Sequence, residues 1–263
     1  MSALASKTSP LNKESVSNWD GEALRTALAG GLPVDAGETT FRIASTLQDR
    51  MAAYGLVYDK YLQKGMLQTN PYRMRVTEFH LAPTTAVFVA LRKGQVIATV
   101  TLIGDGDLGL PMDNIHPDIT DAARHAGLYV GEVSCLAFQK QEMKHVLPVF
   151  IEITRLMAQF ARRNGMHQFL IGCIPQHARF YCRFLGFEQI GDIRPYPTVC
   201  NTLGVACCLD FNRIDRERPD CYDKYFSRRL PESALVAEPM TPFEQDAFAQ
   251  VVQKSEQQLL QMV

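Results

Sequence analysis

The segment from residue 129 to residue 211 constrains the fold most, because short apolar runs alternate along it with amphipathic stretches. The apolar runs predict strands at 129–138, 168–174, 187–191 and 205–211, and the amphipathic stretches predict helices at 149–164 and 175–185. Gly165 and Gly186 follow the two helices as stop signals, and Pro175 opens the second one. Strand–helix–strand units pair their strands in parallel, so this segment predicts a sheet with helices packed on it.

The residues before this segment predict antiparallel strands. Apolar runs at 86–91 and 95–103 are joined by Lys93-Gly94, which is the pattern of a β-hairpin. A first strand is expected at 40–44 and a helix at 47–62, ended by Gly65, whereas Gly, Pro and Asp at 104–114 predict a loop. Parallel and antiparallel pairing together make the expected fold a mixed α/β sheet.

Three segments are expected along the chain. Residues 1–37 are rich in small and polar residues, with one weak helical stretch at 22–28, and are interpreted as an N-terminal extension. Residues 38–212 hold the expected α/β domain. Residues 213–263 are a C-terminal extension, in which an amphipathic pattern predicts a helix at about 242–262.

Composition and charge disfavour several classes of protein. Of 263 residues, 46% are apolar and 21% are charged, which is an ordinary globular balance. Lys and Arg total 27 against 28 Asp and Glu, so the net charge is −1 and nucleic-acid binding is not expected. No apolar run is long enough to span a membrane, and residues 1–10 lack the apolar core of a signal peptide. Seven cysteines without a Cys-x-x-Cys pair predict reduced thiols, a cytoplasmic location and no metal site.

Glu132 is the first candidate for chemistry, because it interrupts the apolar run 129–138. An ionised, unpaired carboxylate inside a strand of this kind costs several kcal/mol. Desolvation raises the pKa of such a group, which suits a general base near neutral pH. The alternative is a carboxylate that is paired with an arginine or that accepts a hydrogen bond from a backbone N–H.

The run 175–187 resembles the Tyr-x-x-x-Gly-Phe element of the GNAT acyltransferase superfamily. Tyr181 lies one residue further from Gly186 than in the usual pattern, so we interpret it as a buried structural residue rather than the acid that protonates the thiolate. Coenzyme A-dependent GNAT enzymes also carry a glycine-rich pyrophosphate loop, whereas residues 139–146 contain no glycine. A donor with a single phosphate on a pantetheine arm fits better, and acyl carrier protein is such a donor.

Four short motifs narrow the resemblance. They are residues 109–113 (GLPMD), 131–137 (GEVSCLA), 175–181 (PQHARFY) and 194–197 (RPYP), and over about residues 40–211 they look like the N-acyl amino acid synthases, relatives of the acyl-homoserine lactone autoinducer synthases. The resemblance implies a GNAT-like fold, with a mostly antiparallel twisted sheet, flanking helices and a central V-shaped split. It also implies transfer of a long-chain acyl group from acyl carrier protein to the α-amine of an amino acid.

The resemblance implies that Glu132 helps to deprotonate the amine. Cys135 stands where autoinducer synthases usually have an arginine, so a homoserine lactone product is not expected. As a nucleophile Cys135 would need a base, and in a regular strand Glu132, three positions away, points to the opposite face. The candidate site residues are catalytic Glu132 and Ser134; substrate-binding Val133, Cys135, Leu136, Thr85, Tyr58 and Tyr181; and Lys140, Lys144, His177, Arg179 and Arg183 for the carrier protein and its pantetheine arm.

The expected reactants are an acyl thioester and an amino acid, with no tightly bound cofactor. Residues 139–190 carry seven Lys or Arg against three acids, a weak indication of a dock for an acidic carrier protein. Two alternatives stay open, namely an acetyl-coenzyme A-dependent acetyltransferase and a non-catalytic GNAT domain that senses acyl ligands or acylated carrier protein. The acceptor amino acid and the oligomeric state are not fixed by the sequence.

Overall fold

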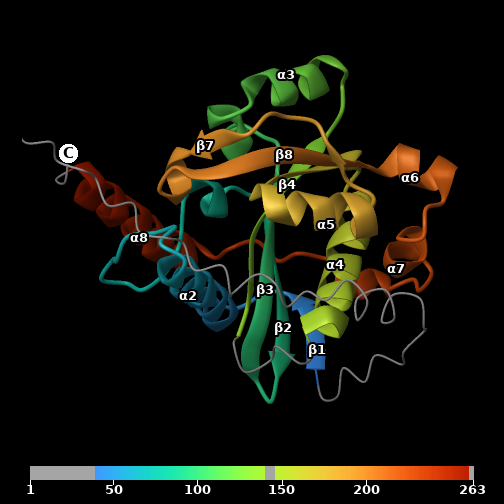
Figure 1. Cartoon of the computed structure of the whole chain (residues 1–263). Coiled ribbons are helices and arrows are strands. Elements are labelled where there is room, and N and C mark those ends of the chain that lie inside the picture. The colour runs from blue at the N-terminus through green and yellow to red at the C-terminus, as the bar shows by residue number, and fades with distance from the viewer. Residues whose placement is uncertain (1–38, 140–145, 261–263) are drawn as a thin grey trace, which may run out of the picture. The chain divides into compact units, whose positions relative to one another are not determined.

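The structure, a computed structural model, describes residues 39–139 and 146–260 (Figure 1). Its strands are β1 (Thr39–Ile43), β2 (Thr85–Arg92), β3 (Gln95–Gly104), β4 (Val130–Phe138), β5 (Gln168–Cys173), β6 (Glu188–Gln189), β7 (Arg194–Tyr196) and β8 (Thr202–Asp210). The main sheet has the order β1-β2-β3-β4-β5-β8-β6, and β7 pairs with β8. Of these pairings only β4 with β5 is parallel. The predicted mixed α/β sheet, mostly antiparallel, is therefore confirmed.

Helices flank the sheet on two faces. The α-helices are α2 (Leu47–Gln63), α3 (Pro117–His125), α4 (Val146–Arg163), α5 (Pro175–Leu185), α6 (Phe211–Glu217), α7 (Tyr222–Phe226) and α8 (Pro242–Leu260). Short 3₁₀ turns are η1 (Glu78–Leu81), η2 (Pro111–Asn114), η4 (Pro197–Val199) and η5 (Glu232–Leu235). Figure 1 shows α2 and α4 on opposite sides of the β2–β3 hairpin.

Strand alternation divides the core between the two faces. On β2, Phe88 and Ala90 pack with α4 and α5, whereas Val87 and Val89 pack with α2 and α8. Further along the second face, η1, η2 and α3 cover the ends of β3, β4 and β5. Two closed faces explain why β2 and β3 are apolar almost throughout instead of alternating with polar residues.

The sheet opens between β4 and β5. Their parallel pairing covers only three rows, from Val130–Gln168 to Glu132–Leu170. β4 then continues along β3 to Phe138, while β5 continues along β8 to Cys173. This separation is the V-shaped split that the resemblance implies, and Glu132 lies on the last paired row.

Several sequence predictions need correction. No sequence pattern predicted α3, and the predicted loop 104–114 contains η2. The predicted strand 187–191 is reduced to Glu188–Gln189, because the N–H groups of Ile190 and Gly191 both donate to the Ala206 carbonyl of β8, which interrupts the regular ladder. The N-terminal extension with its helical stretch, the segment 140–145 and the end of the last predicted helix lie outside the described residues.

The C-terminal segment contacts both faces of the sheet. After β8, α6 and α7 pack beside α4, and α8 then lies against α2 on the other face. Within the described ranges, no helix is both long and apolar enough to cross a membrane.

A buried ion pair anchors α8. Arg50 of α2 donates a hydrogen bond of 2.6 Å to Glu244, and both side chains are almost fully buried. Glu244 also accepts hydrogen bonds from the backbone N–H and the hydroxyl of Thr241, the residue before α8. The Thr241 hydroxyl in turn accepts a hydrogen bond from the Glu244 N–H, so the start of α8 is a capping box, which Arg50 ties to α2.

Candidate active site

Glu132 lies beneath the split between β4 and β5, and its side chain is 5% exposed. Its Oε2 accepts a hydrogen bond of 2.7 Å from the backbone N–H of Met112. No arginine, lysine or histidine forms an ion pair with it in the part of the chain that the structure describes. Burial raises the pKa of Glu132 to about 8; the Met112 N–H acts to lower it, and the charge of Asp113 acts to raise it.

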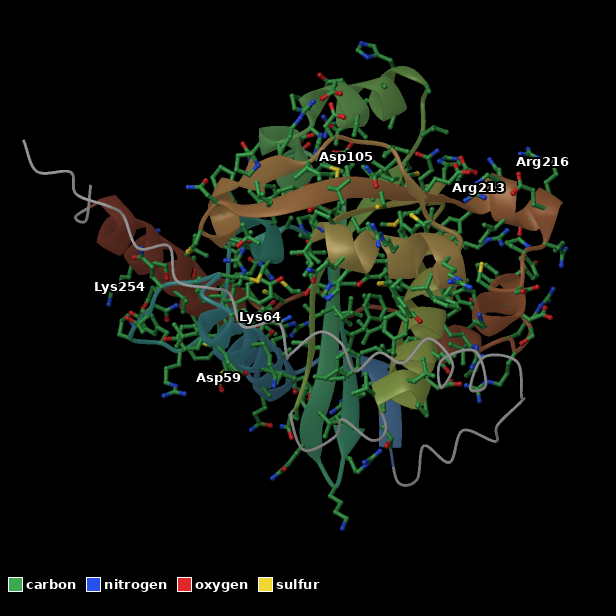
Figure 2. All side chains as sticks on the ribbon, in the orientation of Figure 1. Asp59, Lys64, Asp105, Arg213, Arg216 and Lys254 are labelled. Atoms are coloured by element: carbon green, nitrogen blue, oxygen red, sulfur yellow. The ribbon has the colours of Figure 1, made fainter. Side chains whose placement is uncertain are left out.

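The motif 109–113 forms the turn that delivers the Met112 N–H. Gly109 adopts a positive φ of 66°, and a Cβ there would lie 2.2 Å from the Asp113 carboxylate. Asp113 accepts a hydrogen bond of 2.8 Å from the Leu110 N–H, which closes η2. Arg124 of α3 links Asp113 to Asp105, which lies beneath α3 in Figure 2. This motif thus fixes the backbone donor that holds Glu132.

A β-bulge follows Glu132 on β4. Ser134 pairs with Thr101 and Ala137 with Thr99, so β4 has one more residue than β3 over this stretch. Cys135 adopts a φ of 56° at the bulge, a strained conformation for a residue other than glycine. Strain of this kind is common where backbone geometry serves a function.

The bulge overturns one prediction about Cys135. Regular alternation places Cys135 and Glu132 on opposite faces, but the extra residue turns Cys135 toward α2, on the same face as Glu132. There its Sγ lies 3.9 Å from Nε2 of His80. The interpretation from strand geometry was therefore wrong, because it assumed an unbroken strand.

His80 has the wrong tautomer to activate Cys135. The Thr77 N–H donates to Nδ1 of His80 at 3.1 Å, and burial and the charge of Arg75 lower the pKa of His80 to about 3. The ring is therefore neutral and carries its proton on Nε2, which faces the thiol. A nitrogen that already holds a proton cannot accept one from Cys135, so the pair does not form a nucleophile and base.

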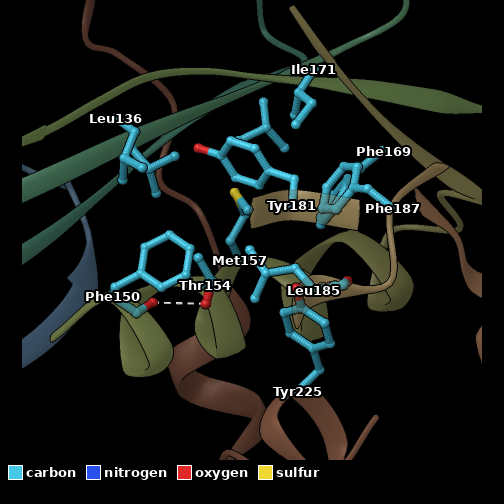
Figure 3. A pocket seen from close by; sticks show the side chains of 12 residues that line it. Leu136, Phe150, Thr154, Met157, Phe169, Ile171, Tyr181, Leu185, Phe187 and Tyr225 are labelled. Carbon is cyan, nitrogen blue, oxygen red and sulfur yellow. Dashed lines mark hydrogen bonds between the residues drawn. The ribbon is translucent and has the colours of Figure 1, made fainter. Parts of the chain in front are cut away.

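An apolar cavity of about 30 Å³ lies on the opposite face of the split (Figure 3). Val133 and Leu136 of β4, Phe169 and Ile171 of β5, and side chains of α4 and α5 line it, and Tyr225 of α7 lies at one end. The bulge also explains why Val133 and Leu136 share this face. A cavity of this size holds about two water molecules, so a larger ligand has to displace side chains such as Met157.

Tyr181 contributes a hydroxyl to the lining of this mostly apolar cavity. In Figure 3 its hydroxyl points toward Leu136, away from Tyr225. Burial raises the pKa of Tyr181 far above its usual value, with smaller contributions from Cys173 and Cys207, so the hydroxyl stays protonated. Its ring packs edge-on against Phe180 and Phe187, consistent with the predicted structural role.

The motif 194–197 brings Tyr196 to the Glu132 face of the sheet. Its ring covers Gly172 of β5 and Gly204 of β8, where an added Cβ would lie 2.5 Å and 2.6 Å from ring atoms. Burial raises the pKa of Tyr196, and the charge of Glu132 raises it further. Glycine at these two positions allows an aromatic ring to lie flat beside the split.

Three other predicted residues have structural partners. Thr85 lies in the same row as Glu132, two strands away, and its hydroxyl donates to the Phe79 carbonyl at 2.6 Å. The Tyr58 hydroxyl accepts a hydrogen bond from the Asn70 N–H at 3.3 Å. Ser134 donates to the thiol of Cys135 at 3.6 Å.

The predicted basic dock is reduced by ion pairs that the charge count could not detect. Arg155, Arg162 and Arg163 of α4 pair with Glu152, Asp215 and Glu232 respectively. Arg179 and Arg183 of α5 are exposed, while Lys140 and Lys144 lie outside the described residues.

His177 lies at the start of α5. Its pKa is lowered by burial and by the charge of Lys64, the residue that follows α2 (Figure 2). The beginning of α5 and the end of α2 therefore lie within electrostatic range of each other. No group of three or more His, Cys, Asp or Glu side chains could hold a metal ion in the described ranges.

Solved structures with the same fold are acyltransferases. FeeM, an N-acyl amino acid synthase from uncultured soil microbes, matches with a TM-score of 0.58 and 27% identity, over 66% of this chain and 91% of that one. The acyl-homoserine lactone synthase LasI has a TM-score of 0.54 and 13% identity, over 73% of this chain and 96% of that one. BjaI, a coenzyme A-dependent acyl-homoserine lactone synthase, has a TM-score of 0.52 and 12% identity, over 80% of this chain and 99% of that one. No curated protein matches the sequence.

The split, mostly antiparallel sheet and the match to FeeM define an N-acyltransferase of the GNAT fold. The sequence matches the family described as N-acyl amino acid synthase FeeM over residues 52–210, which is more than half of the chain. The chain belongs to this family.

Proposed function

We propose that this N-acyltransferase moves a fatty acyl group from acyl carrier protein to the α-amine of an amino acid. One observation carries the proposal. Glu132 and the apolar cavity lie on opposite faces of the sheet, at the point where β4 and β5 separate. A thioester held in the split would have its acyl chain in the cavity and its carbonyl group open to an amine on the Glu132 face.

The transfer needs no covalent enzyme intermediate. Glu132 takes a proton from the amine, directly or through water, and the nitrogen attacks the thioester carbonyl. The new C–N bond replaces the C–S bond, and the pantetheine thiolate leaves. From Val133 onward β4 has no pairing with β5, so backbone N–H groups at this edge are available to polarise the thioester carbonyl. Ser134 remains a candidate hydrogen-bond donor beside it.

Acyl carrier protein is the preferred donor in this proposal. Residues 139–146, before α4, contain no glycine, so a backbone cradle for the pyrophosphate of coenzyme A is poorly formed. The exposed Arg179 and Arg183 offer positive charge to one phosphate and to an acidic carrier. His177, whose pKa is lowered by burial and by Lys64, is neutral near pH 7 and can offer a ring N–H to the phosphate. The reaction then needs two substrates, acyl thioester and amino acid, and a cytoplasmic location gives access to both.

Mass spectrometry tests the donor and the acceptor together. Purified protein is incubated with a mixture of amino acids and either acyl carrier protein or coenzyme A carrying the same acyl group. We expect products with the mass of fatty acid plus amino acid minus water. We also expect kcat/KM to be higher with the acylated carrier protein than with acyl-coenzyme A. Faster transfer from coenzyme A would contradict the donor assignment. Ligand binding without any product would instead favour a non-catalytic sensor.

The proposal also predicts which residue limits the acyl chain. Tyr225 is 3% exposed, lies at the end of the cavity away from Leu136, and donates a hydrogen bond of 3.3 Å to the Leu185 carbonyl. Tyr225→Ala is expected to shift the preference to longer chains. Each additional buried methylene contributes about 0.8 kcal/mol, so two of them raise kcat/KM about tenfold.

Competition between acyl chains of different length measures this shift. Tyr222→Ala on the same helix is the matched control, because Tyr222 does not line the cavity. Tyr225→Phe keeps the ring and should keep the wild-type profile. An unchanged profile in folded Tyr225→Ala would mean that the chain does not extend toward α7.

A further inference from the structure

A cluster of polar side chains beside the β4 bulge has no role in the transfer step described above. This Arg75 cluster consists of Tyr54, Tyr61, Arg75, His80 and Cys135. The Arg75 guanidinium lies over the Tyr61 ring at 5.1 Å, and the Tyr61 hydroxyl interacts with the Cys135 thiol. His80 contacts the same thiol and packs edge-on against Tyr54, with ring centroids 5.0 Å apart.

Arg75 is a half-buried cation without a counter-ion. No carboxylate in residues 39–139 or 146–260 forms an ion pair with it, and its Nε is buried without a hydrogen-bond partner there. Its neighbours differ: Arg50 pairs with Glu244 at 2.6 Å, and Arg73 pairs with Asp59 at 3.0 Å. Removing a guanidinium from water without a compensating charge is unfavourable, so this position suits an anionic ligand.

Tyr54 supplies an independent observation. Its side chain is 1% exposed, and its hydroxyl is buried with no hydrogen-bond partner among the described residues. Burial raises its pKa, with smaller contributions from Arg50, which lowers it, and from Cys135 and Glu244, which raise it, so the hydroxyl keeps its proton and can donate a hydrogen bond to an acceptor atom. A buried donor without a partner carries a desolvation cost that a bound oxygen atom removes.

The Arg75 cluster lies on the same face of the sheet as Glu132. Cys135 of the cluster and Glu132 are three residues apart on β4, and the bulge turns both toward the helices and turns that cover this face. η1, which contains His80, and η2, which contains the Met112 donor to Glu132, pack in adjoining parts of that cover. The Arg75 cluster, with its cation and its unpartnered hydroxyl, therefore lies on the face of the sheet that carries Glu132.

We infer that the Arg75 cluster binds the carboxylate of the acceptor, with Arg75 as the cation and Tyr54 as a hydrogen-bond donor. The inference rests on the proposed function and deepens it, because it makes the acceptor an amine that carries a carboxylate, as an α-amino acid does. Guanidinium binds carboxylate through two parallel hydrogen bonds, which also fixes its orientation. The amine of the same molecule is then directed to Glu132.

A phosphate of the donor is the other anion that Arg75 would attract. The acceptor carboxylate is favoured because the acyl cavity opens on the α4 and α5 face, where His177, Arg179 and Arg183 are available for a phosphate. If Arg75 binds the acceptor carboxylate, its replacement raises the KM for the amino acid. If it binds the donor phosphate, its replacement raises the KM for the acyl thioester.

The test compares acceptors that differ only in the carboxylate. Leucine and isoamylamine form one pair, and phenylalanine and phenethylamine form another, each assayed with a fixed acyl thioester. In the wild type we expect the amino acid of a pair to be preferred. Arg75→Gln should raise the KM for the amino acid about 10- to 100-fold and leave transfer to the matched amine nearly unchanged. Arg75→Lys, which keeps the charge and loses the planar fork, should give a smaller increase.

Arg73→Gln is the matched control, because Arg73 is two residues away, exposed and paired with Asp59. An Arg75→Gln variant with an unchanged preference for the carboxylate would overturn the inference, as would a raised KM for the thioester alone. If the wild type forms no amide, the proposed function fails, and thermal shifts of the wild type and Arg75→Gln with leucine then decide the inference. Stabilisation of the wild type but not of the variant supports it, and stabilisation of neither rejects it.

Discussion

Replacing Glu132 by glutamine should lower kcat for acyl transfer by about 100- to 10,000-fold, the range that a general base contributes. Glutamine has nearly the same size, and its amide oxygen can accept the hydrogen bond that Met112 donates to Glu132. It cannot take a proton from the amine. The measurement is the initial rate of thiol release with an amino acid acceptor. Glu78→Gln, at an exposed carboxylate on η1, is the control and should keep the wild-type rate.

The pH dependence of kcat/KM is a second test of Glu132→Gln. Because burial raises the pKa of Glu132 to about 8, most of the carboxyl group is protonated at neutral pH. The kcat/KM of the wild type should therefore increase with pH and level off above about pH 8, whereas Glu132→Gln should lack this increase. Near-full activity in the variant, or an identical pH profile, would exclude Glu132 as the base.

A measurement of folding stability shows whether the loss of activity in Glu132→Gln comes from unfolding. Glu132 holds its proton more tightly in the folded chain than in the unfolded chain, where its pKa is about 4.3. The wild type therefore loses folding free energy as the pH rises from the unfolded pKa toward the folded one. Glu132→Gln has no such loss, so at pH 8 it should be at least as stable as the wild type in urea unfolding.

The second large effect concerns the attachment of α8. Glu244→Gln removes the charge that pairs with Arg50 at 2.6 Å and leaves a guanidinium that is 4% exposed without its counter-ion. Breaking a buried pair from one side costs about 3–5 kcal/mol. We expect the free energy of unfolding, measured with urea, to fall by about this amount. Glu238→Gln is the control, because the Glu238 side chain is exposed and only its backbone carbonyl accepts a bond from Arg50.

The pH dependence of this effect has the opposite sign to that of Glu132. Burial alone would raise the pKa of Glu244, but the hydrogen bonds from Thr241 and the pairing with Arg50 outweigh it and lower the pKa. The pair therefore stabilises the folded chain above the unfolded pKa of about 4.3 and loses this contribution as the pH falls below it. The wild type and Glu244→Gln should converge in stability in acid, and a difference that persists there would mean that ionisation of Glu244 is not its cause.

The fold was predictable where local patterns were strong. Apolar runs, the Lys93-Gly94 turn and the stop at Gly186 located most strands and the helices α2, α4 and α5. α3 was missed because a short helix opened by Pro117 follows a stretch rich in Gly, Pro and Asp, which reads locally as a loop. α6 and α7 are also too short for a periodic pattern to identify them.

The candidate site was only partly predictable, because its contacts join residues far apart in sequence. Glu132 was found as a carboxylate in an apolar strand, which is a local signal. Arg75 and His80 were not, since nothing in their local sequence indicates that His80 contacts Cys135 or that Arg75 lies over Tyr61. The β4 bulge gave no signal either, because Cys135 has no preference for a positive φ. The domain boundaries and the roles of the site residues stay predictions.

The position of Tyr225 has a consequence for the order in which the molecule becomes competent. Synthesis runs from the N-terminus, so all eight strands leave the ribosome before α7 does. A nascent chain can pair its sheet while the end of the apolar cavity is still open and its lining is still exposed to water. Closure of that cavity by Tyr225 is thus a late event in folding during synthesis. A chain that stalls before α7 would expose the apolar lining of the cavity, which is the kind of surface that chaperones bind.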